Sequence, residues 1–371
     1  MEYKKYYLSD LLKIKNGKDH SSLSEGSFPV YGSGGVMRYV SCYLYDGVSI
    51  LLPRKGNIKN IQYVDGKFWT VDTTFYTDIN KEIVNPYYLF RYLQGLKLHN
   101  FDTGTSIPSM TSKLYNKVRV LLPDKTYQDS VAIFIKQYDN LIENNNNRIK
   151  LLEQIAQEIY KEMFVRNQSE NCKIKISELG VILESGRRPK GGIDSSLLEG
   201  IPSLGAESIN SLGEFDYSSV KMIPYEFYKT MKTGVFKNGD ILIYKDGAYI
   251  GKTTMFKNNF PFESFVVNEH VFLMRATNEK YQNYLYFTLN QKCYFDLMQI
   301  LNRNAAQPGL TKPDVLSIKI NNPSDEKIET FNSLANPILD EIFILAHQNK
   351  NLINQRDLLL PRLMSGKLEV K

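Results

Sequence analysis

Apolar residues recur every seven positions along two long stretches of the chain, residues 126–166 and 325–366. In the first stretch, the two repeating series are Ile135, Ile142, Ile149, Ala156, Met163 and Val131, Tyr138, Asn145, Leu152, Ile159. In the second stretch, they are Phe331, Ile338, Leu345, Leu352, Leu359 and Ala335, Ile342, Asn349, Arg356, Leu363. This spacing, sustained over about five heptads, predicts two long helices whose apolar stripes need a partner helix.

One asparagine stands near the middle of each seam, Asn145 in the first helix and Asn349 in the second. If the helices pair antiparallel about their centres, the two side chains meet in one layer, where a buried Asn pair would fix the register. The alternative is that both are exposed polar residues. Pro337 stands in the first turns of the second helix, where proline kinks a helix, and Pro361 and Gly366 mark its end.

The segments before the two helices, residues 1–125 and 167–324, alternate β-branched and aromatic runs with Gly, Asn and Asp turns. Strands are predicted at Ser49–Leu52, Phe68–Thr74, Asp240–Tyr244 and Phe265–Phe272. Short amphipathic helices are predicted at Pro86–Leu96, with Asn85 as its cap, and at Glu279–Leu301. Both segments are therefore expected to be α+β domains with a twisted, irregular sheet.

The two globular segments carry similar sequence in the same order, which indicates an internal duplication. The matches are Leu8–Leu11 with Ile176–Leu179, Gly17 with Gly186, Gly26–Val30 with Gly200–Leu204, Asn85–Leu89 with Tyr281–Leu285, Thr105–Thr111 with Ala305–Thr311, and Val118–Pro123 with Ile318–Pro323. The offset grows from about 170 to about 200 residues along the chain, so the middle segments differ in length. Each match is weak alone, so the evidence for duplication is the order that all of them share.

The net charge of +6 is concentrated in the globular segments. Residues 1–125 carry 17 basic and 11 acidic side chains, and residues 167–324 carry 18 and 16, whereas each helical segment is slightly acidic. This distribution favours a polyanion bound by the domains and proteins bound by the helices, with ordinary solvated surface as the alternative. The chain lacks a membrane-length apolar run, a signal peptide and paired cysteines, so we expect a soluble cytoplasmic protein without a disulfide framework or structural zinc.

Motifs that carry chemistry are incomplete in this chain. Gly247–Thr253 is one residue short of a phosphate-binding loop, and no helix is predicted after it. Asn85–Tyr88 lacks the second proline of an amino-methyltransferase motif, and Pro313-Asp314 with Lys319 lacks the second carboxylate of a nuclease metal site. No histidine has metal-ligand spacing. The chain is therefore expected to be non-catalytic.

These features together resemble the specificity subunit of type I restriction–modification systems. Leu151–Val165 is similar to the central conserved helix of that family, and Leu358–Val370 is similar to its C-terminal conserved segment. Gly239–Ile243, with Gly251-Lys252 after it, resembles a strand and loop of the family's target-recognition domain. The resemblance spans the whole chain. The first half departs from it, because Asp46–Leu51 replaces the Gly-Asp-Ile-Leu run.

The resemblance implies target-recognition domains at residues 1–125 and 167–324, and spacer helices at 126–166 and 325–371, paired antiparallel in a pseudo-twofold body. It implies a DNA-binding subunit that reads a bipartite, asymmetric target and scaffolds two methyltransferase subunits, with or without two restriction subunits. S-adenosylmethionine, ATP and Mg²⁺ are then expected on the partner subunits, with none bound by this chain. Two domains on one spacer suit DNA half-sites about one helical turn, roughly 34 Å, apart.

If the chain binds DNA, Lys and Arg side chains supply affinity by contacting phosphates, and polar side chains supply specificity by contacting base edges. In the first domain, the candidates are Arg38, Arg54, Lys55, Lys59 and Ser106. In the second domain, they are Arg187, Arg188, Lys190, Lys245, Tyr249, Lys252, Arg303, Asn304 and Gln307. Arg187–Gly192 is the strongest local signal, since its exposed backbone beside three cations suits a phosphate. Solvated surface is the alternative for each residue.

Two other functional classes stay open at this point. One is a coiled-coil scaffold that recruits proteins without reading bases, although such a protein has no need of basic loops. The other is a DNA methyltransferase or nuclease with degenerate motifs, which would require the sequence elements that this chain lacks.

Overall fold

The structure, a computed structural model, describes residues 2–96, 98, 109–166, 173–193, 196–247, 249–301 and 309–369. The chain divides into two compact units. Unit 1 comprises Met1–Asn140 with Leu352–Lys371, and unit 2 comprises Leu141–Asn351. Each unit therefore contains one globular domain together with parts of both long helices. None of the helices in the described ranges is long and apolar enough to cross a membrane.

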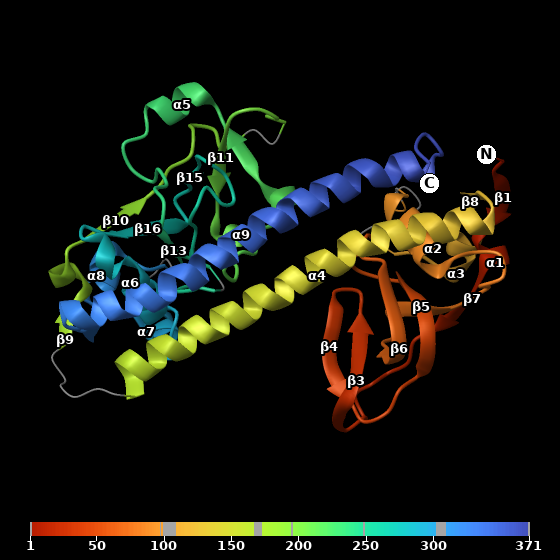
Figure 1. Cartoon of the computed structure of the whole chain (residues 1–371), viewed down its shortest axis with the longest axis horizontal. Coiled ribbons are helices and arrows are strands. Elements are labelled where there is room, and N and C mark those ends of the chain that lie inside the picture. Colours follow the sequence, from red (N-terminus) through yellow and green to blue (C-terminus); the bar gives the residue numbers. More distant parts are fainter. Residues whose placement is uncertain are drawn as a thin grey trace. The chain divides into compact units, whose positions relative to one another are not determined.

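Unit 1 is built on a six-stranded sheet with the order β2-β7-β5-β6-β3-β4, beside a two-stranded sheet β1-β8 (Figure 1). Its strands are β1 (Lys4–Tyr7), β2 (Leu12–Asn16), β3 (Glu25–Gly32), β4 (Gly35–Val40), β5 (Tyr45–Pro53), β6 (Gln62–Thr70), β7 (Thr74–Ile79) and β8 (Arg119–Leu122). Its short helices are α1 (Leu8–Leu11), α2 (Pro86–Gly95) and α3 (Ser112–Asn116). The side chain of Asn85 caps α2 by accepting from the N–H groups of Tyr87 and Tyr88, which confirms the predicted cap.

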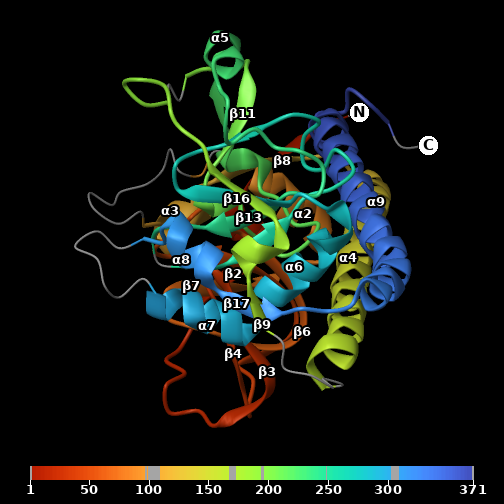
Figure 2. The ribbon, with the colours of Figure 1, turned by 90° about the vertical axis from the view of Figure 1, so that its left-hand side faces the viewer.

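Unit 2 contains a four-stranded sheet β10-β16-β13-β14, a three-stranded sheet β12-β11-β15 and the pair β17-β9. Its strands are β9 (Lys173–Lys175), β10 (Val181–Ser185), β11 (Ile201–Leu204), β12 (Lys221–Ile223), β13 (Ile241–Tyr244), β14 (Thr253–Met255), β15 (Val266–Val267), β16 (Val271–Ala276) and β17 (Lys319–Asn321). Its short helices are α5 (Tyr225–Lys229), α6 (Gln282–Leu289), α7 (Lys292–Leu301) and α8 (Lys312–Ser317). Helix α6 lies between the four-stranded sheet and the long helices (Figure 2).

The two units share one plan, which confirms the predicted duplication. In both, the first strand pairs antiparallel with the last strand, β1 with β8 and β9 with β17. The order β2-β7-β5-β6 of unit 1 returns as β10-β16-β13-β14 in unit 2. A parallel pairing also recurs, β3 with β6 and β11 with β15. Since these pairings join segments far apart in sequence, the weak sequence matches mark equivalent structural positions.

Gly17 and Gly186 mark the same close approach in the two units. A Cβ atom at Gly17 would lie 2.1 Å from the carbonyl oxygen of Val71, and one at Gly186 would lie 1.5 Å from that of Val267. In each unit, the loop after β2 or β10 crosses the turn that precedes β7 or β16. Glycine recurs because the backbones approach too closely for any side chain.

The long helices are α4 (Lys125–Lys161), continued by a π-turn at Glu162–Arg166, and α9 (Asp325–Met364). In unit 1, the hydroxyl of Tyr127 near the start of α4 donates to the carbonyl of Leu363 near the end of α9, at 3.0 Å. In unit 2, Phe164 after α4 packs edge-on against Phe331 near the start of α9, with ring centroids 5.3 Å apart. The helices therefore run antiparallel, and every predicted seam position is buried or half-buried.

The two central asparagines meet within unit 2. The side-chain amide of Asn145 donates to the side-chain oxygen of Asn349 at 3.0 Å, and Asn349 donates in turn to Asn146 at 2.7 Å. Asn145 and Asn349 are each 6% exposed, so they are not solvated surface residues. The expected layer is present; its role in fixing the register remains a prediction.

Some predicted boundaries are wrong for identifiable reasons. Phe265–Phe272 is not one strand: Val266–Val267 pairs with β11, the chain turns, and β16 starts at Val271. Phe68–Thr74 likewise joins the end of β6 to the start of β7. Helix α9 continues through Pro361 to Met364, and Gly366, with φ +68°, follows it. Periodicity alone does not show which neighbouring strand each half of an apolar run will pair with.

Helix α4 buries one carboxyl group against the domain of unit 2. Burial raises the pKa of Glu153 to about 6, and Glu214 adds to the shift, while hydrogen bonds from the Leu212 backbone and the Tyr286 hydroxyl oppose it. Tyr286 itself lies on α6 and is 1% exposed. The protonated carboxyl is therefore the form that suits this contact.

The raised pKa of Glu153 makes the stability of unit 2 depend on pH. Between the ordinary value of 4.5 and about 6, the folded chain binds a proton that the unfolded chain has released, so stability falls as pH rises through this window. Glu153→Gln is expected to remove this dependence and to raise the free energy of unfolding at pH 7.5 by up to about 2 kcal/mol. Hydrogen exchange of the α6 amides at pH 5 and 7.5, in wild type and variant, measures this change in stability. The exposed Glu143→Gln is the control, and an equal response would contradict the assignment.

Candidate nucleic-acid interface

Loops from four parts of unit 2 converge at one edge of its sheet. The backbone N–H of Lys245, after β13, donates to the carbonyl of His270 in the turn before β16, at 3.0 Å. The N–H of Leu310 donates to the carbonyl of Lys245 at 2.8 Å. The loop after β10 crosses the same turn at Gly186. Residues 186–192, 245–247, 249–252, 268–270 and 309–310 therefore form a continuous rim.

A network of charged side chains fixes this rim. Arg188 forms an ion pair with Glu269 and lies 3.1 Å from Nε2 of His270, whose Nδ1 lies 2.6 Å from a carboxylate oxygen of Asp246. Nζ of Lys245 donates to the Glu269 carbonyl at 3.2 Å. Burial raises the pKa of Glu269, but the bond with Arg188 outweighs it, and the pKa lies below its usual value. Five loop side chains are thus held in one arrangement.

The three cations of Arg187–Gly192 differ in how far their charge is compensated. Arg187 donates to the carbonyl and hydroxyl of Thr230, at 2.7 and 2.9 Å, which are neutral partners. Arg188 is neutralised by Glu269. Lys190 is exposed, and no ion pair to it occurs within the described residues. Arg187 and Lys190 are therefore better placed to attract a phosphate than Arg188 is.

The β13–β14 connection presents the remaining described candidates of unit 2. The N–H of Lys252 donates to the carbonyl of Tyr249 at 3.0 Å, which closes a tight turn. Tyr249 is 64% exposed at this turn, and its ring meets Tyr244 edge-on. An exposed aromatic ring and two lysines on one hairpin suit contact with nucleic acid.

Unit 1 repeats the rim with different side chains. The N–H groups of Arg54 and Lys55 both point to the carbonyl of Thr73, at 2.8 and 3.3 Å, and the carbonyl of Arg54 accepts from Met110 at 2.9 Å. Arg54 therefore occupies the position of Lys245, and Thr73 that of His270. Lys59 is exposed further along the same loop. The structure brings these three candidates together.

Other candidates are not part of this loop. Arg38 lies on β4, and its guanidinium donates to the carbonyl of Leu23 at 2.6 Å, which ties that strand to the loop between β2 and β3. Ser106, Arg303, Asn304 and Gln307 lie outside the described residues.

Sequence reasoning missed the network residues Asp246, Glu269 and His270. In the sequence, no other histidine stands at metal-ligand spacing from His270. The available signal was the polar break Asn268–His270 inside an apolar run. Such a break indicates a turn, and a turn at a sheet edge brings its side chains to a site.

The fold and these rims define a class: a duplicated protein with a basic loop edge on each unit and two paired long helices. Comparison with protein families matches residues 1–154 and 169–355 to the type I restriction modification DNA specificity domain. The chain belongs to this family.

Individual relatives agree with the family. The chain is 25% identical over 310 residues to the type I restriction enzyme MjaVIII specificity subunit of Methanocaldococcus jannaschii, over 78% of this chain and 72% of that protein. It is 24% identical over 301 residues to the MjaIX specificity subunit of the same organism, over 77% and 69%. The S subunit of a type I restriction–modification system from M. genitalium has the same fold, with a TM-score of 0.62 at 16% identity, covering 98% of this chain and 96% of that chain.

Proposed function

We propose that this chain is the DNA-binding specificity subunit of a type I restriction–modification complex, in which each unit reads one half of a bipartite target. The observation that carries the proposal is the repeated rim, where Arg54 and Lys245 hold the same backbone position at equivalent sheet edges. Loops held on a rigid sheet can differ in side chains while keeping one geometry. The family membership supports the same function.

The target is asymmetric in this proposal, because the equivalent rim positions differ between the units. Thr73 of unit 1 corresponds to His270 of unit 2, and the Asp246–His270–Arg188 network belongs to unit 2. Side chains with different donors and acceptors select different base edges in the major groove. The two half-sites are therefore expected to have unrelated sequences.

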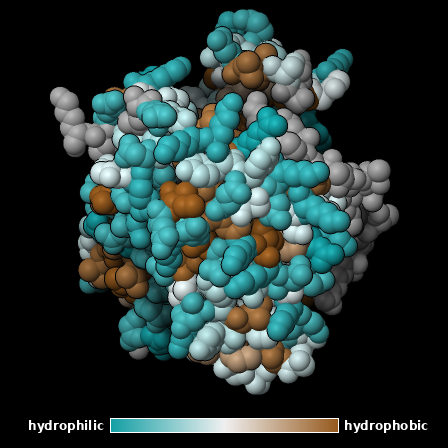
Figure 3. Space-filling model, turned by 90° about the vertical axis from the view of Figure 1, so that its right-hand side faces the viewer, coloured by the Kyte–Doolittle hydropathy of each residue, from teal (hydrophilic) through white to brown (hydrophobic). Residues whose placement is uncertain are grey.

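The long helices and their surroundings hold the protein partners, two methyltransferase subunits with or without two restriction subunits. Leu151 and Ile155 are 59% and 50% exposed one turn apart on α4, a spacing that suits another helix. In unit 1, an apolar groove of about 610 Å³ is lined by Tyr92, Leu121 and Leu360, among others. Hydrophobic patches lie among hydrophilic residues on the side of the chain where β1 and β8 lie (Figure 3). Such surfaces favour a protein rather than DNA.

The chemistry of the complex is assigned to the partners. The chain itself is non-catalytic in this proposal and binds no cofactor, while S-adenosylmethionine, ATP and Mg²⁺ act on the partner subunits. The complex works in the cytoplasm, where the DNA is. The contribution of this chain is to position the partners on a chosen sequence.

Replacing Arg187 and Arg188 together by Ala is expected to weaken DNA binding by the assembled complex. Because Arg188 is already neutralised, the slope of log Kd against log salt should fall by about 1, the effect of one phosphate contact. Fluorescence anisotropy at several salt concentrations measures the slope. Lys292→Ala is the control, since Lys292 is exposed on α7 and pairs with Asp296. Unchanged affinity of the double variant at physiological salt would refute the role.

A further inference from the structure

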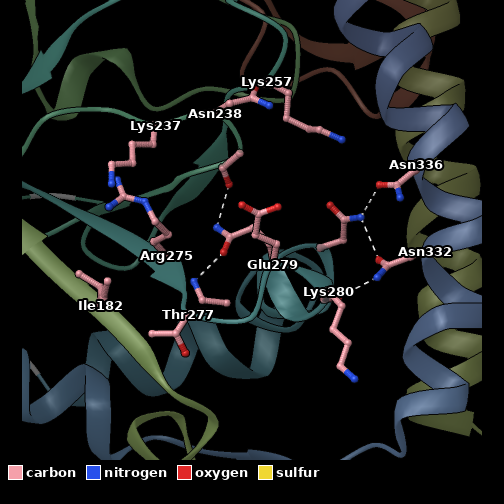
Figure 4. A pocket seen from close by; sticks show the side chains of 14 residues that line it. Ile182, Lys237, Asn238, Lys257, Arg275, Thr277, Glu279, Lys280, Asn332 and Asn336 are labelled. Atoms are coloured by element: carbon pink, nitrogen blue, oxygen red, sulfur yellow. Dashed lines mark hydrogen bonds between the residues drawn. The ribbon is translucent and has the colours of Figure 1, made fainter.

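Two hollows in the described parts of the chain are lined by several basic side chains, and they differ in how those charges are compensated. The first, in unit 2, has a volume of about 820 Å³ and lies beside α6 and α9 (Figure 4). Three of its cations form ion pairs: Arg275 with Asp240, Lys257 with Asp340, and Lys280 with Asp325. Most of its positive charge is therefore neutralised within the protein.

The second hollow, in unit 1, has a volume of about 690 Å³ and uncompensated charge. Its lining residues are Tyr7, Ser9, Lys113, Asn116, Lys117 and Arg119. None of these is acidic. The three cations are exposed, and none has an ion-pair partner among the residues that the structure describes. Three positive charges facing one concave surface repel one another unless an anion binds between them.

Local structure aims these cations at the hollow. In the β1–β8 pair, Tyr7 stands directly opposite Arg119, so their side chains project from the same face. Lys113 lies on α3 and Lys117 is its C-cap residue, and Thr111 caps the start of this helix by accepting from the N–H of Leu114 at 3.3 Å. The lining thus combines cations with two hydroxyl groups and an amide, all of which can donate to phosphate oxygens.

The hollow adjoins the loop edge of unit 1 along the chain. Helix α3 starts two residues after Met110, whose N–H donates to the carbonyl of Arg54 in the rim. Helix α3 therefore follows the rim of unit 1 directly along the chain. The fold itself does not require the two lysines, because Pro313 and Ser317 stand at their equivalent positions at α8 in unit 2, whereas Lys319 takes the place of Arg119.

We propose that the hollow of Lys113, Lys117 and Arg119 binds backbone phosphates of duplex DNA just outside the half-site that unit 1 reads. The inference rests on the proposed function, which places DNA on the rim of unit 1. The contact is independent of sequence, because phosphates carry no base information. It adds affinity to the complex and leaves its choice of target unchanged.

The test compares the double variant Lys113→Gln, Lys117→Gln with wild type, each assembled with the methyltransferase subunit. Binding to a long duplex is measured from 50 to about 300 mM salt, with the target or an unrelated sequence. We expect the salt slope to fall by about 2 and both duplexes to lose affinity by the same factor. Wild type should bind a target duplex shortened at the flank beyond unit 1 more weakly, by the same factor as the double substitution causes. The double variant should bind the shortened and the full-length duplex with equal affinity.

Matched controls separate the outcomes. Lys67→Gln with Lys81→Gln removes two other exposed lysines of unit 1 and should leave the slope unchanged. An unchanged slope in the hollow variant overturns the proposal, as does a loss of assembly with the methyltransferase subunit at unaltered DNA affinity, which would assign the hollow to an acidic protein surface. A wild-type complex without preference for any target would instead refute the proposed function.

Discussion

Replacing Asp139 by Asn is expected to lower the free energy of unfolding of unit 1 by about 3 kcal/mol. Asp139 lies on α4 and pairs with Arg91 of α2 and, at 2.7 Å, with Arg356 of α9, while the Tyr87 hydroxyl donates to it. These three charged side chains are only 13–19% exposed. The variant leaves Arg91 mostly buried without its carboxylate partner, whereas Arg356 keeps its pair with Asp357, and a buried charge without its partner is costly.

The same cluster sets the pH dependence of unit 1. Burial raises the pKa of Asp139, but the hydrogen bond from Tyr87 and the two guanidinium groups outweigh it, so the pKa lies below the ordinary 3.8. Its contribution is thus complete above that value and is lost as pH falls through the lowered pKa. Asp139→Asn should abolish this acid-sensitive part of the free energy of unfolding of unit 1.

The single tryptophan, Trp69, belongs to unit 1, so its fluorescence during urea unfolding reports on the correct unit. Asp78→Asn is the control, because Asp78 pairs with Lys15 at a site where both side chains are 41–49% exposed. That variant should lose less than about 1 kcal/mol. Equal losses in the two variants would show that the cluster does not hold the helices to the domain.

Replacing Gly186 by Ala is expected to abolish discrimination in one half of the target and leave the other half intact. The new Cβ would lie 1.5 Å from the carbonyl oxygen of Val267, so the loop after β10 or the turn before β16 must move. Overpacking of this kind costs about 3 kcal/mol locally, and it displaces Arg187 and His270 together. Gly17→Ala, with its 2.1 Å approach to Val71, should affect the opposite half.

The measurement is binding of the assembled complex to duplexes with base changes in either half-site. Gly34→Ala is the control, because no atom lies within 4 Å of its added Cβ. Loss of the same half by both glycine variants would contradict the assignment of one half-site to each unit. So would full discrimination by both.

Local pattern and repetition predicted the parts of the fold that depend on single segments. The heptad seams, the meeting of Asn145 with Asn349 and the cap at Asn85 follow from spacing and backbone chemistry that the sequence displays. The sequence match of Gly17 with Gly186 indicated equivalent positions, and the close approach of two backbone segments at each glycine explains the match. These features follow from residue spacing within each segment and from comparison of the two halves of the chain.

Features that depend on distant segments were not predicted. Arg356 occupies a predicted seam position, but its partner Asp139 is a side chain 217 positions away that belongs to neither seam series of its helix. The split of Phe265–Phe272 depends on β11 and β10, which attract its two halves to different sheets. Likewise, the compensation of Arg188 by Glu269 appears only once the loops are folded together.

The central claim is that the two units each read half of one DNA target, and mapping of DNA methylation tests it most directly. The chain is co-expressed with its methyltransferase subunit, and methylated bases are mapped across the host genome. We predict one motif of two unrelated half-sites separated by a fixed gap of unread bases, and we expect its methylation to disappear without this chain. An uninterrupted or palindromic motif, or methylation that is the same without the chain, would contradict it.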